Sequence, residues 1–429
     1  MKSDPVLAAL LAAVPGAVPA AVELYLRSHR DPELSGAEKS TAARLAARLA
    51  ATGLDVTGGV GGHGVVAVLR NGAGPAVMLR TELDALPVRE QTGLPYASTA
   101  TALDASGREV PVMHACGHDL HLACVAGAAE VLAAQRAHWQ GTLIVVGQPA
   151  EETLSGAQSM LADGLYERFD TPAAVLAQHT APLPAGMIAY SHGPVTAASA
   201  SVHVVIHGRG GHASSPHLAV DPVLTAAAIV LRLQGIVARE TSPADQAAVT
   251  VGAIHAGRTT NIIPDQATLD ITIRALSQDT LERSLASVRR IIAAECDAAG
   301  NTQQPDITLV SKSPANVPDP SLAAAVRVRH VEAFGPERVT YWPASLAAED
   351  FPLFGPAGSH LHGKSEIRTA YWMLGVVGPA QWSAAPGTSA AEKLTVLPPN
   401  HAPDFRPDPR LSIPAGISAL AAAFLAALP

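Results

Sequence analysis

The chain has 429 residues, of which 48% are hydrophobic and 15% are charged, and its formal net charge is -8. This length exceeds one ordinary domain, so we expect two domains and at least one large core. Proteins that bind nucleic acid present basic surfaces to the phosphates, and this composition argues against such a partner.

The first predicted elements are helices. Residues 1–21 are apolar and alanine-rich, as in a signal peptide, but three prolines and Asp4 argue against that interpretation. From residue 20 the apolar spacing predicts two amphipathic helices, the second beginning after Ser35 or Gly36 and ending at Gly53. Runs of about 18 or more residues all contain charges or helix breakers, so we expect no membrane span and no membrane partner.

Buried strands and helices then alternate along the chain. Strands are predicted over 63–69, 76–84 and 141–148, a helix over 122–135, and a further strand that ends just before His179. This alternation is typical of an α/β fold with a mostly parallel sheet flanked by helices. In such folds the chemistry gathers at the carboxyl ends of the strands.

The predicted order changes to β-α-β-β-α-β between residues 190 and 312, which is the order of a ferredoxin-like unit. We therefore predict a catalytic domain over residues 1–189 and 313–429, and an inserted domain over residues 190–312. The chain then returns to helices and strands and ends in an alanine-rich helix.

Three glycines, Gly59, Gly61 and Gly64, fit the G-x-G-x-x-G pattern of dinucleotide-binding loops. That motif must follow a strand and open a helix, whereas a strand-like segment follows here. A glycine-rich turn is the better interpretation, and it argues against a nicotinamide-dependent dehydrogenase.

The three cysteines, Cys116, Cys124 and Cys296, are odd in number and irregularly spaced. Such spacing does not indicate a disulfide framework and favours a reducing compartment. We therefore expect the protein in the cytoplasm.

The segment MHACGHDLH, residues 113–121, concentrates possible metal ligands. If residues 113–118 are extended, His114, Cys116 and His118 lie on one side, and Asp119 is placed to cap the following helix. A thiolate and an imidazole two residues apart can hold one metal ion. Alternatively, the cysteine is a small buried hydrophobe and the histidines are satisfied core residues, and this segment alone does not decide.

Other ionisable side chains follow predicted strands, and strand ends of one sheet are neighbours in space. These are Glu151 with Glu152, His179, and Glu82 with Asp84. Two adjacent carboxylates can divide their roles, one binding metal and the other accepting a proton from water. The proline-rich segment around His401 would by itself mean little.

Eight stretches together resemble the M20 metallopeptidases, in order and over about residues 24 to 410. They are HRDPELS, RTELDALP, MHACGHD, GQPAEE, GRGGHASSPHLAVDPV, GRTTNIIPDQA, AEDFPLF and NHAPDFRPD. The chain looks most similar to the amidohydrolase branch, which includes hippurate hydrolases, N-acyl-amino-acid hydrolases and auxin-conjugate hydrolases. It departs from the pattern at Glu82, where relatives commonly have aspartate, at Gln178, and just after His401. These departures concern substrate preference and leave the ligands in place.

The resemblance implies two divalent metal ions per subunit, with Cys116 bridging them. His118 and His179 would complete one site, and Glu152 and His401 the other. Thiolate and imidazole ligands favour zinc, although manganese, cobalt or nickel would also serve.

The resemblance also implies the catalytic groups. Glu151 would be the general base and would return its proton to the leaving amine, while Asp84 would orient a metal ligand. In the inserted domain, His212 would stabilise the oxyanion. Asn261 and Arg274 would bind the carboxylate of an N-acyl amino acid or short peptide substrate.

Two other functions stay open. A dipeptidase or carboxypeptidase of the same superfamily would need a pocket for the substrate's free amine, which the sequence does not locate. A non-catalytic descendant that binds a carboxylate ligand would be expected to have lost a ligand or the base, and all are present. The resemblance further implies a homodimer, in which the inserted domain can supply His212 to the partner subunit.

Overall fold

The structure is a computed structural model that describes residues 4–429 and divides them into two compact units. Unit 1 runs to Val195 and resumes over Val317–Pro343 and Asp350–Pro429, and unit 2 comprises Thr196–Asn316 and Ala344–Glu349. The last of these segments was assigned to the catalytic domain from the sequence. It belongs to unit 2 because its backbone bonds there, the Ala197 N–H donating to the carbonyl of Ala347 over 2.8 Å.

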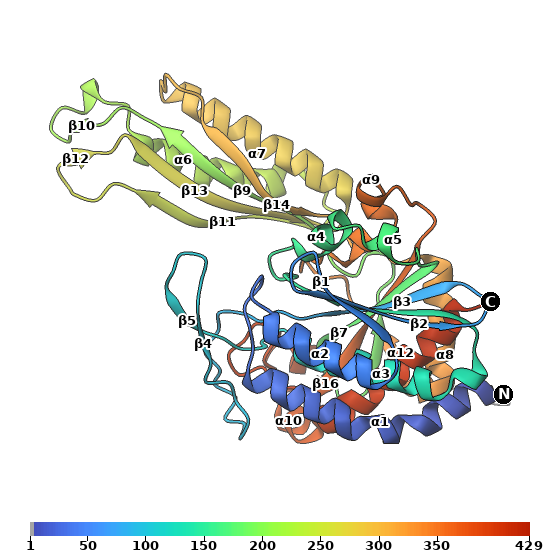
Figure 1. The fold of residues 1–429 in the computed structure, drawn as a ribbon. Helices are drawn as coiled ribbons and strands as arrows, with labels where there is room; N and C mark the ends of the chain where they lie inside the picture. The colour runs from blue at the N-terminus through green and yellow to red at the C-terminus, as the bar shows by residue number, and fades with distance from the viewer. Residues whose placement is uncertain (1–3) are drawn as a thin grey trace. The chain divides into compact units, whose positions relative to one another are not determined.

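Unit 1 is built on an eight-stranded sheet in the order β1-β2-β6-β3-β7-β16-β8-β15 (Figure 1). Its strands are β1 (Asp55–Val60), β2 (Gly64–Asn71), β3 (Ala76–Glu82), β6 (Gly141–Gln148), β7 (Ala174–Pro184), β8 (Ile188–Tyr190), β15 (Val339–Tyr341) and β16 (Arg368–Val377). The four central strands β6, β3, β7 and β16 are parallel, while β2 and β8 pair antiparallel with their central neighbours. The predicted α/β class with a mostly parallel sheet is therefore confirmed.

The central strands are buried on both faces, as their nearly continuous apolar runs require. Alternate residues face two different cores: Val77 and Leu79 of β3 lie in one, and Met78 lies in the other. Five helices cover the first face: α1 (Pro5–Arg30), α2 (Lys39–Ala51), α3 (His118–Ala134), α8 (Pro320–Phe334) and α12 (Pro409–Ala427). The second core includes residues of α4 (Gly156–Ala162), α5 (Leu165–Arg168) and α9 (Ser359–His362).

The remaining elements of unit 1 are short. They are the hairpin β4 (Thr101–Leu103) and β5 (Glu109–Pro111), and the helices α10 (Pro379–Ala384) and α11 (Ala390–Leu394). The glycine-rich segment at 59–64 is the turn between the antiparallel strands β1 and β2. Since no helix follows it directly, it lacks the strand-turn-helix context of a dinucleotide-binding loop.

Helix α1 begins at Pro5, well before the residue 20 expected from the sequence. Asp4 caps it, its side chain accepting a hydrogen bond from the Val6 N–H over 2.9 Å, and proline is favoured at the first helical position. Pro15 and Pro19 both lie on the exposed side, while the buried positions recur every three or four residues. The prolines therefore leave the packed face of the helix intact.

Three helical segments of the described chain are long and apolar enough to cross a membrane, judged by length and composition alone. They are Pro5–Arg30, Pro222–Glu240 and Pro409–Ala427. The sequence-based expectation discounted such runs because of their helix breakers, but Pro15, Pro19 and Pro414 all lie inside helices. In this structure α1 and α12 both pack on α3 in the core of unit 1.

Unit 2 contains a four-stranded antiparallel sheet in the order β11-β13-β9-β14. Its main elements follow the predicted β-α-β-β-α-β order: β9 (Ala198–His207), α6 (Pro222–Gly235), β11 (Ala247–Ala256), β13 (Gln266–Ala275), α7 (Gln278–Ala298) and β14 (Asp306–Ser313). The helices and the sheet enclose a separate hydrophobic core. Two short strands, β10 (Gly211–His212) and β12 (Ile262–Ile263), pair with each other outside that sheet.

Candidate metal centre

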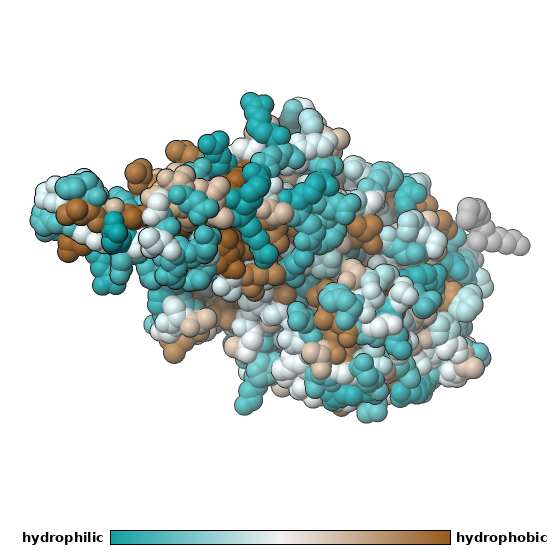
Figure 2. Space-filling view, turned by 90° about the horizontal axis from the view of Figure 1, so that it is seen from above, coloured by the Kyte–Doolittle hydropathy of each residue, from teal (hydrophilic) through white to brown (hydrophobic). Residues whose placement is uncertain are grey.

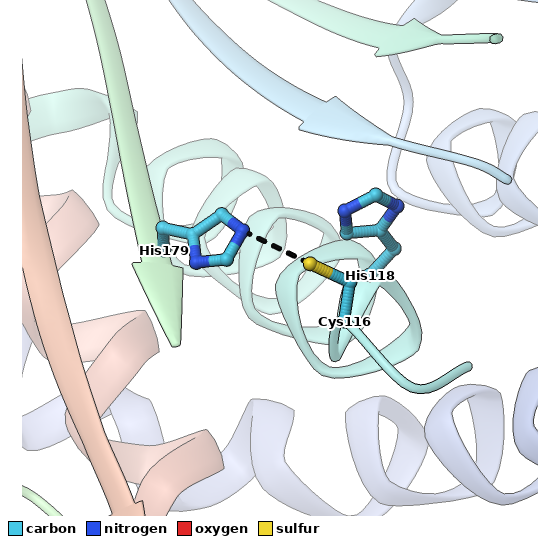
Figure 3. A group of neighbouring side chains, drawn as sticks. All are labelled: Cys116, His118 and His179. Carbon is cyan, nitrogen blue, oxygen red and sulfur yellow. Dashed lines mark hydrogen bonds between the residues drawn. The ribbon is translucent and has the colours of Figure 1, made fainter. Parts of the chain in front are cut away.

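Five side chains from four segments of unit 1 meet near the carboxyl ends of its central strands. They are Cys116 in the turn before α3, His118 at the start of α3, Glu152 after β6, His179 on β7, and His401 before α12. Figure 3 shows His179 reaching from its strand toward Cys116 and His118. The Sγ atom of Cys116 lies 3.4 Å from Nε2 of His179 and 3.3 Å from Nε2 of His401.

The ligand atoms form two groups, and within each group they lie within 4.8 Å of one another. One group is Cys116, His118 and His179, and the other is Cys116, Glu152 and His401. Cys116 belongs to both groups. The arrangement can therefore hold two cations that share one thiolate, in the same two sets that the family resemblance implies.

Two buried polar atoms in this cluster have no hydrogen-bond partner among the described residues, namely Nε2 of His118 and Oε1 of Glu152. They lie 3.9 Å apart. A buried polar atom without a partner costs about 1–3 kcal/mol, and a bound cation would remove that cost. Thiolate, imidazole and carboxylate are also ligands that zinc and similar ions take. The residues therefore fit two divalent cations.

The negative charges of the carboxylates around the cluster also favour bound cations. Burial raises the pKa of the Cys116 thiol well above its usual value, and the carboxylates of Glu152 and Glu151 raise it further. Burial lowers the pKa of His118, but the hydrogen bond to Asp84 and the charge of Glu82 outweigh this and raise it to about 10. Without cations both groups hold protons, so metal binding must displace those protons.

Asp84 orients two parts of the cluster. Its Oδ1 atom and its main-chain oxygen lie 3.2 and 3.0 Å from Nδ1 of His118, which leaves Nε2 of that ring to face a cation. Its Oδ2 atom accepts hydrogen bonds from the Ser35 hydroxyl at 2.7 Å and from the Glu152 N–H at 2.9 Å. Burial raises the pKa of Asp84, but His118 lowers it below its usual value overall.

Glu151 lies beside the first group of ligands, with its Oε2 atom 3.7 Å from Nε2 of His118. Its position follows from a strained turn, since Ala150 has a φ of 49°, a region that residues with a Cβ rarely adopt. The Ala150 N–H donates to Oε1 of Glu38 at 2.8 Å, which helps to hold the turn. The turn buries Glu151 and directs Glu152 toward the second group.

The extended conformation considered for residues 113–118 is not what the structure has. A turn at Ala115 and Cys116 leads to Gly117, with a φ of 82°, and α3 begins at His118. His114 is in none of the possible metal-binding groups of the described residues, and burial lowers its pKa to about 4. It is a neutral core histidine rather than a ligand.

Asp119 does not cap α3, because Gly117 occupies the N-cap position. It lies in the first turn instead, where its Oδ2 atom is 2.7 Å from Nδ1 of the buried His29. Its role is therefore to tie the start of α3 to the end of α1.

His179 does not lie past the end of its strand, as the sequence predicted, but inside β7. That strand continues along β16 as far as Pro184, whereas it pairs with β3 only over 174–176. His179 therefore lies on the part of β7 that extends beyond β3, which still places it near the other ligands.

The three predicted residues of unit 2 do not all come together within the subunit, because Arg274 lies apart from the other two. His212 on β10 is exposed and adjoins Asn261, whose carbonyl accepts a hydrogen bond from the Ala213 N–H at 3.1 Å. Arg274 lies near the other end of β13, where its Nη1 atom donates to the Leu346 carbonyl at 2.9 Å. Eight residues of strand separate Arg274 from the start of β13, which corresponds to roughly 26 Å.

Three residues at the centre were missed from the sequence: Thr180, Asn400 and His121. The Asn400 side chain donates to the Thr180 hydroxyl at 2.9 Å, and the Thr180 N–H donates to His121 at 2.8 Å. Threonine and asparagine carry no ionisable group, so a search for metal and proton chemistry passes over them. The only sequence signal is position, since Thr180 follows His179 and Asn400 precedes His401.

Comparison with known proteins decides the family. The profile of peptidase family M20/M25/M40 matches residues 78–386, which is more than half of the chain. The chain belongs to peptidase family M20.

Several M20 relatives are similar over most of their length. Hippurate hydrolase of Campylobacter jejuni is 39% identical over 265 residues, which are 61% of this chain and 66% of that protein. N-acetylcysteine deacetylase of Bacillus subtilis is 31% identical over 376 residues, covering 86% of this chain and 91% of that protein. The resemblance to the amidohydrolase branch of the family is therefore confirmed.

A solved M20 structure agrees with the fold. The Bacillus subtilis YXEP protein, described as a dinuclear metal-binding peptidase, aligns with a TM-score of 0.71 and 25% identity, over 96% of this chain and 99% of that one. This M20 protein is thus a metal-dependent hydrolase with an amidohydrolase-like sequence.

Proposed function

We propose that this M20 hydrolase cleaves the amide bond of N-acyl amino acids in the cytoplasm, using two divalent ions, with zinc as the favoured metal. The observation that carries the proposal is the sharing of Cys116 by two ligand groups, with the Glu151 carboxylate beside them. The names of the similar hippurate hydrolase and N-acetylcysteine deacetylase support the substrate class. Three free cysteines fit a reducing compartment.

The ions would polarise the amide carbonyl and acidify a water molecule. Glu151 is the general base that accepts the proton of that water and then donates it to the leaving amine. Once a cation displaced one proton of His118, the hydrogen bond to Asp84 would keep the remaining proton on Nδ1 and leave Nε2 for the metal. The protein therefore contributes proton transfer and ligand orientation.

His212 is suited to donate a hydrogen bond to the oxyanion. Its Nδ1 atom accepts from the Ser214 N–H at 3.1 Å and lies 2.7 Å from the Ser214 hydroxyl. Because Nδ1 accepts, the proton of the neutral ring is on Nε2, and the exposed His212 side chain can donate it to a substrate oxygen. Losing one such donor typically slows the reaction by about 100-fold or more.

The proposed substrate class is tested with a panel of N-acetyl, N-benzoyl and longer-chain acyl amino acids, each paired with its carboxamide and with a free dipeptide. The metal-loaded enzyme should prefer the acids over the carboxamides by about 10-fold or more in kcat/KM, because Arg274 and Asn261 bind the carboxylate. Faster cleavage of the dipeptides would favour the peptidase alternative. Substrate binding without any turnover would favour the non-catalytic alternative.

We also propose a homodimer in which unit 2 of one subunit serves the site of the other. Asn261 and Arg274 lie far apart within one chain, so both can bind one carboxylate only if different subunits provide them. Helix α6 supports pairing, because it exposes Leu224 by 70% and Leu231 by 76% next to the edge strand β11. Figure 2 shows hydrophobic residues at the surface of unit 2, on the left of that view. Such an exposed apolar surface indicates an interaction site.

The shared site predicts complementation between two inactive variants, Glu151→Gln and His212→Ala. In a mixed dimer, one of the two sites combines an intact Glu151 with an intact His212 from the other subunit. Mixed dimers purified through two different affinity tags should therefore recover about half of the wild-type activity, since one site in two is complete. Folded mixed dimers that stay inactive would show that His212 serves its own chain or has no catalytic role.

A further inference from the structure

Thr180 joins the segments that carry three of the proposed metal ligands. We propose that it is a positioning residue, which holds Cys116, His179 and His401 in their metal-binding arrangement before any ion binds. The proposal rests on the two-ion site described above and extends it to a residue that touches neither substrate nor metal. It follows from the contacts of the hydroxyl, the methyl group and the peptide of Thr180.

The hydroxyl of Thr180 links two ligand segments. It donates to the main-chain carbonyl of Cys116 at 2.8 Å and accepts from Nδ2 of Asn400 at 2.9 Å. The same Asn400 amide also donates to the Cys116 carbonyl at 3.1 Å, so the three groups form a closed triangle. Asn400 immediately precedes His401, and the triangle therefore fixes the distance between the bridging cysteine and that histidine.

The position of His401 needs such support, because its φ of 72° is unfavourable for a residue with a side chain. Its N–H donates to the carbonyl of Ala115 at 2.8 Å, on the same turn that carries Cys116. A strained conformation persists only where its surroundings hold it. The triangle of hydrogen bonds and this backbone bond together hold His401 in place.

The side chain of Thr180 also packs against the turn between Cys116 and His118. A Cβ atom added at Gly117 would lie 2.9 Å from both Cγ2 and Oγ1 of Thr180, and the φ of Gly117 is 82°. Only glycine fits both the space and the conformation. The turn therefore packs directly against Thr180. This side chain thereby helps to set the spacing between Cys116 and His118.

The backbone of Thr180 orients the third ligand. Its carbonyl accepts a hydrogen bond from Nδ1 of His179 at 2.9 Å, which leaves Nε2 of that ring facing Cys116. Its N–H donates to Nε2 of His121 at 2.8 Å. Since that nitrogen accepts, the proton of the neutral His121 ring is on Nδ1, which donates to Oε2 of Glu82 at 2.9 Å.

A buried ion pair anchors this chain of hydrogen bonds. Arg80 pairs with the second oxygen of Glu82, and both residues are only 1% exposed. The Nε atom of Arg80 also donates to Oε1 of Gln148 at 2.8 Å. Buried polar networks in which every group is paired are rigid. Removing one member of such an ion pair would leave an uncompensated buried charge. Thr180 is thereby connected to β3 and β6 in the middle of the sheet.

The test compares Thr180→Val, which keeps the shape but removes the hydroxyl, with Thr180→Ser, which keeps the hydroxyl. Zinc and cobalt affinities of the purified full-length protein are measured by competition with a chelator. The valine variant should bind about 10- to 100-fold more weakly, as expected when a group that orients ligands is lost. The serine variant should stay within a few-fold of the wild type.

Cobalt spectra separate positioning from a general loss of stability. In the cobalt-loaded valine variant, the thiolate-to-cobalt absorption should shift or weaken, whereas the serine variant should resemble the wild type. Melting temperatures of the metal-free proteins show whether both variants fold. If the valine variant does not fold, Asn400→Ala removes two of the three hydrogen bonds of the triangle, and it should weaken metal binding in the same direction.

A folded valine variant with wild-type affinity and a wild-type cobalt spectrum would overturn the proposal, and so would a folded Asn400→Ala with both unchanged. A wild-type protein that binds neither zinc nor cobalt would overturn the metal site itself and this proposal with it. A wild-type protein that binds metal normally but hydrolyses none of the tested substrates would contradict only the proposed function. It would leave the positioning role of Thr180 intact.

Discussion

Replacing Cys116 with alanine should lower activity by more than about 100-fold and reduce the bound metal to less than one equivalent per subunit. The physical reason is that its thiolate belongs to both ligand groups, so its loss weakens both ions at once. Removing a group that merely orients a ligand already costs about 10- to 100-fold in metal affinity or activity. Metal content is measured on the purified protein by elemental analysis, together with hydrolysis of an N-acyl amino acid.

Cys124→Ala provides the matched control for this experiment. Cys124 is also buried, but it lies on α3, where its Sγ atom faces the carbonyl of Ile413 at 3.8 Å, and it belongs to none of the possible metal-binding groups of the described residues. The control should keep its metal and most of its activity. Chelation of the wild type should abolish activity, and added zinc should restore it. Full activity in a demonstrably metal-free wild type would contradict the metal-dependent mechanism.

Replacing Glu151 with glutamine should lower kcat by about 100-fold or more while metal content stays near that of the wild type. Glutamine keeps the size of the side chain but cannot accept the proton of water. The ligands themselves remain in place, since Glu151 belongs to neither of the two groups that share Cys116. Turnover and metal content are measured on the same preparation.

Glu152→Gln is the control that separates the two neighbouring carboxylates. Glu152 lies in the second ligand group, with Oε1 3.5 Å from Nε2 of His401, so this variant should lose metal as well as activity. The opposite pattern, in which Glu151→Gln strips the metal and Glu152→Gln does not, would mean that the two glutamates exchange their roles.

The centre of the fold could be predicted from the sequence because buried parallel strands have nearly continuous apolar runs. The runs AVML at 76–79 and LIVV at 143–146 show this pattern, and the strands that contain them are buried along their whole length. The edge of the sheet could not be predicted in the same way. Strand β1 has the sequence DVTGGV and is largely exposed, so it shows little of the apolar pattern or composition of a buried strand.

The proximity of the proposed ligands could be predicted from one rule, that the ends of parallel strands meet at one edge of a sheet. The rule worked for Glu151 and Glu152, which directly follow β6. It gave the right neighbourhood for His179 although β7 is longer than expected, because the extra length runs beyond β3. Conformation was harder to predict, since the left-handed glycine at 117 turned an apparent strand into a helix start and separated His114 from the ligands.

Residues whose importance comes only from tertiary hydrogen bonds left almost no sequence signal. Thr180 and Asn400 would be ordinary polar residues in most loops, and their role becomes visible only when the main-chain oxygen of Cys116 is located between them. The site residues predicted in unit 2 are a different case, because only the resemblance to the M20 family grouped His212 with Arg274. The distance between His212 on β10 and Arg274 near the end of β13 could not be read from sequence alone.

The presence of Cys116 in both ligand groups also bears on how the chain is synthesised. Its partner in the first ligand group, His179, follows it by 63 residues, whereas His401 of the second group follows by 285 residues. Ribosomes add about 5–20 residues per second, so the first group is synthesised within roughly 3–13 s of Cys116 and the second is complete only after roughly 15–60 s. The first ligand group is therefore synthesised long before the second, but the part of β7 that carries His179 pairs with β16 (Arg368–Val377) and not with β3, so both groups reach their final positions only near the end of synthesis.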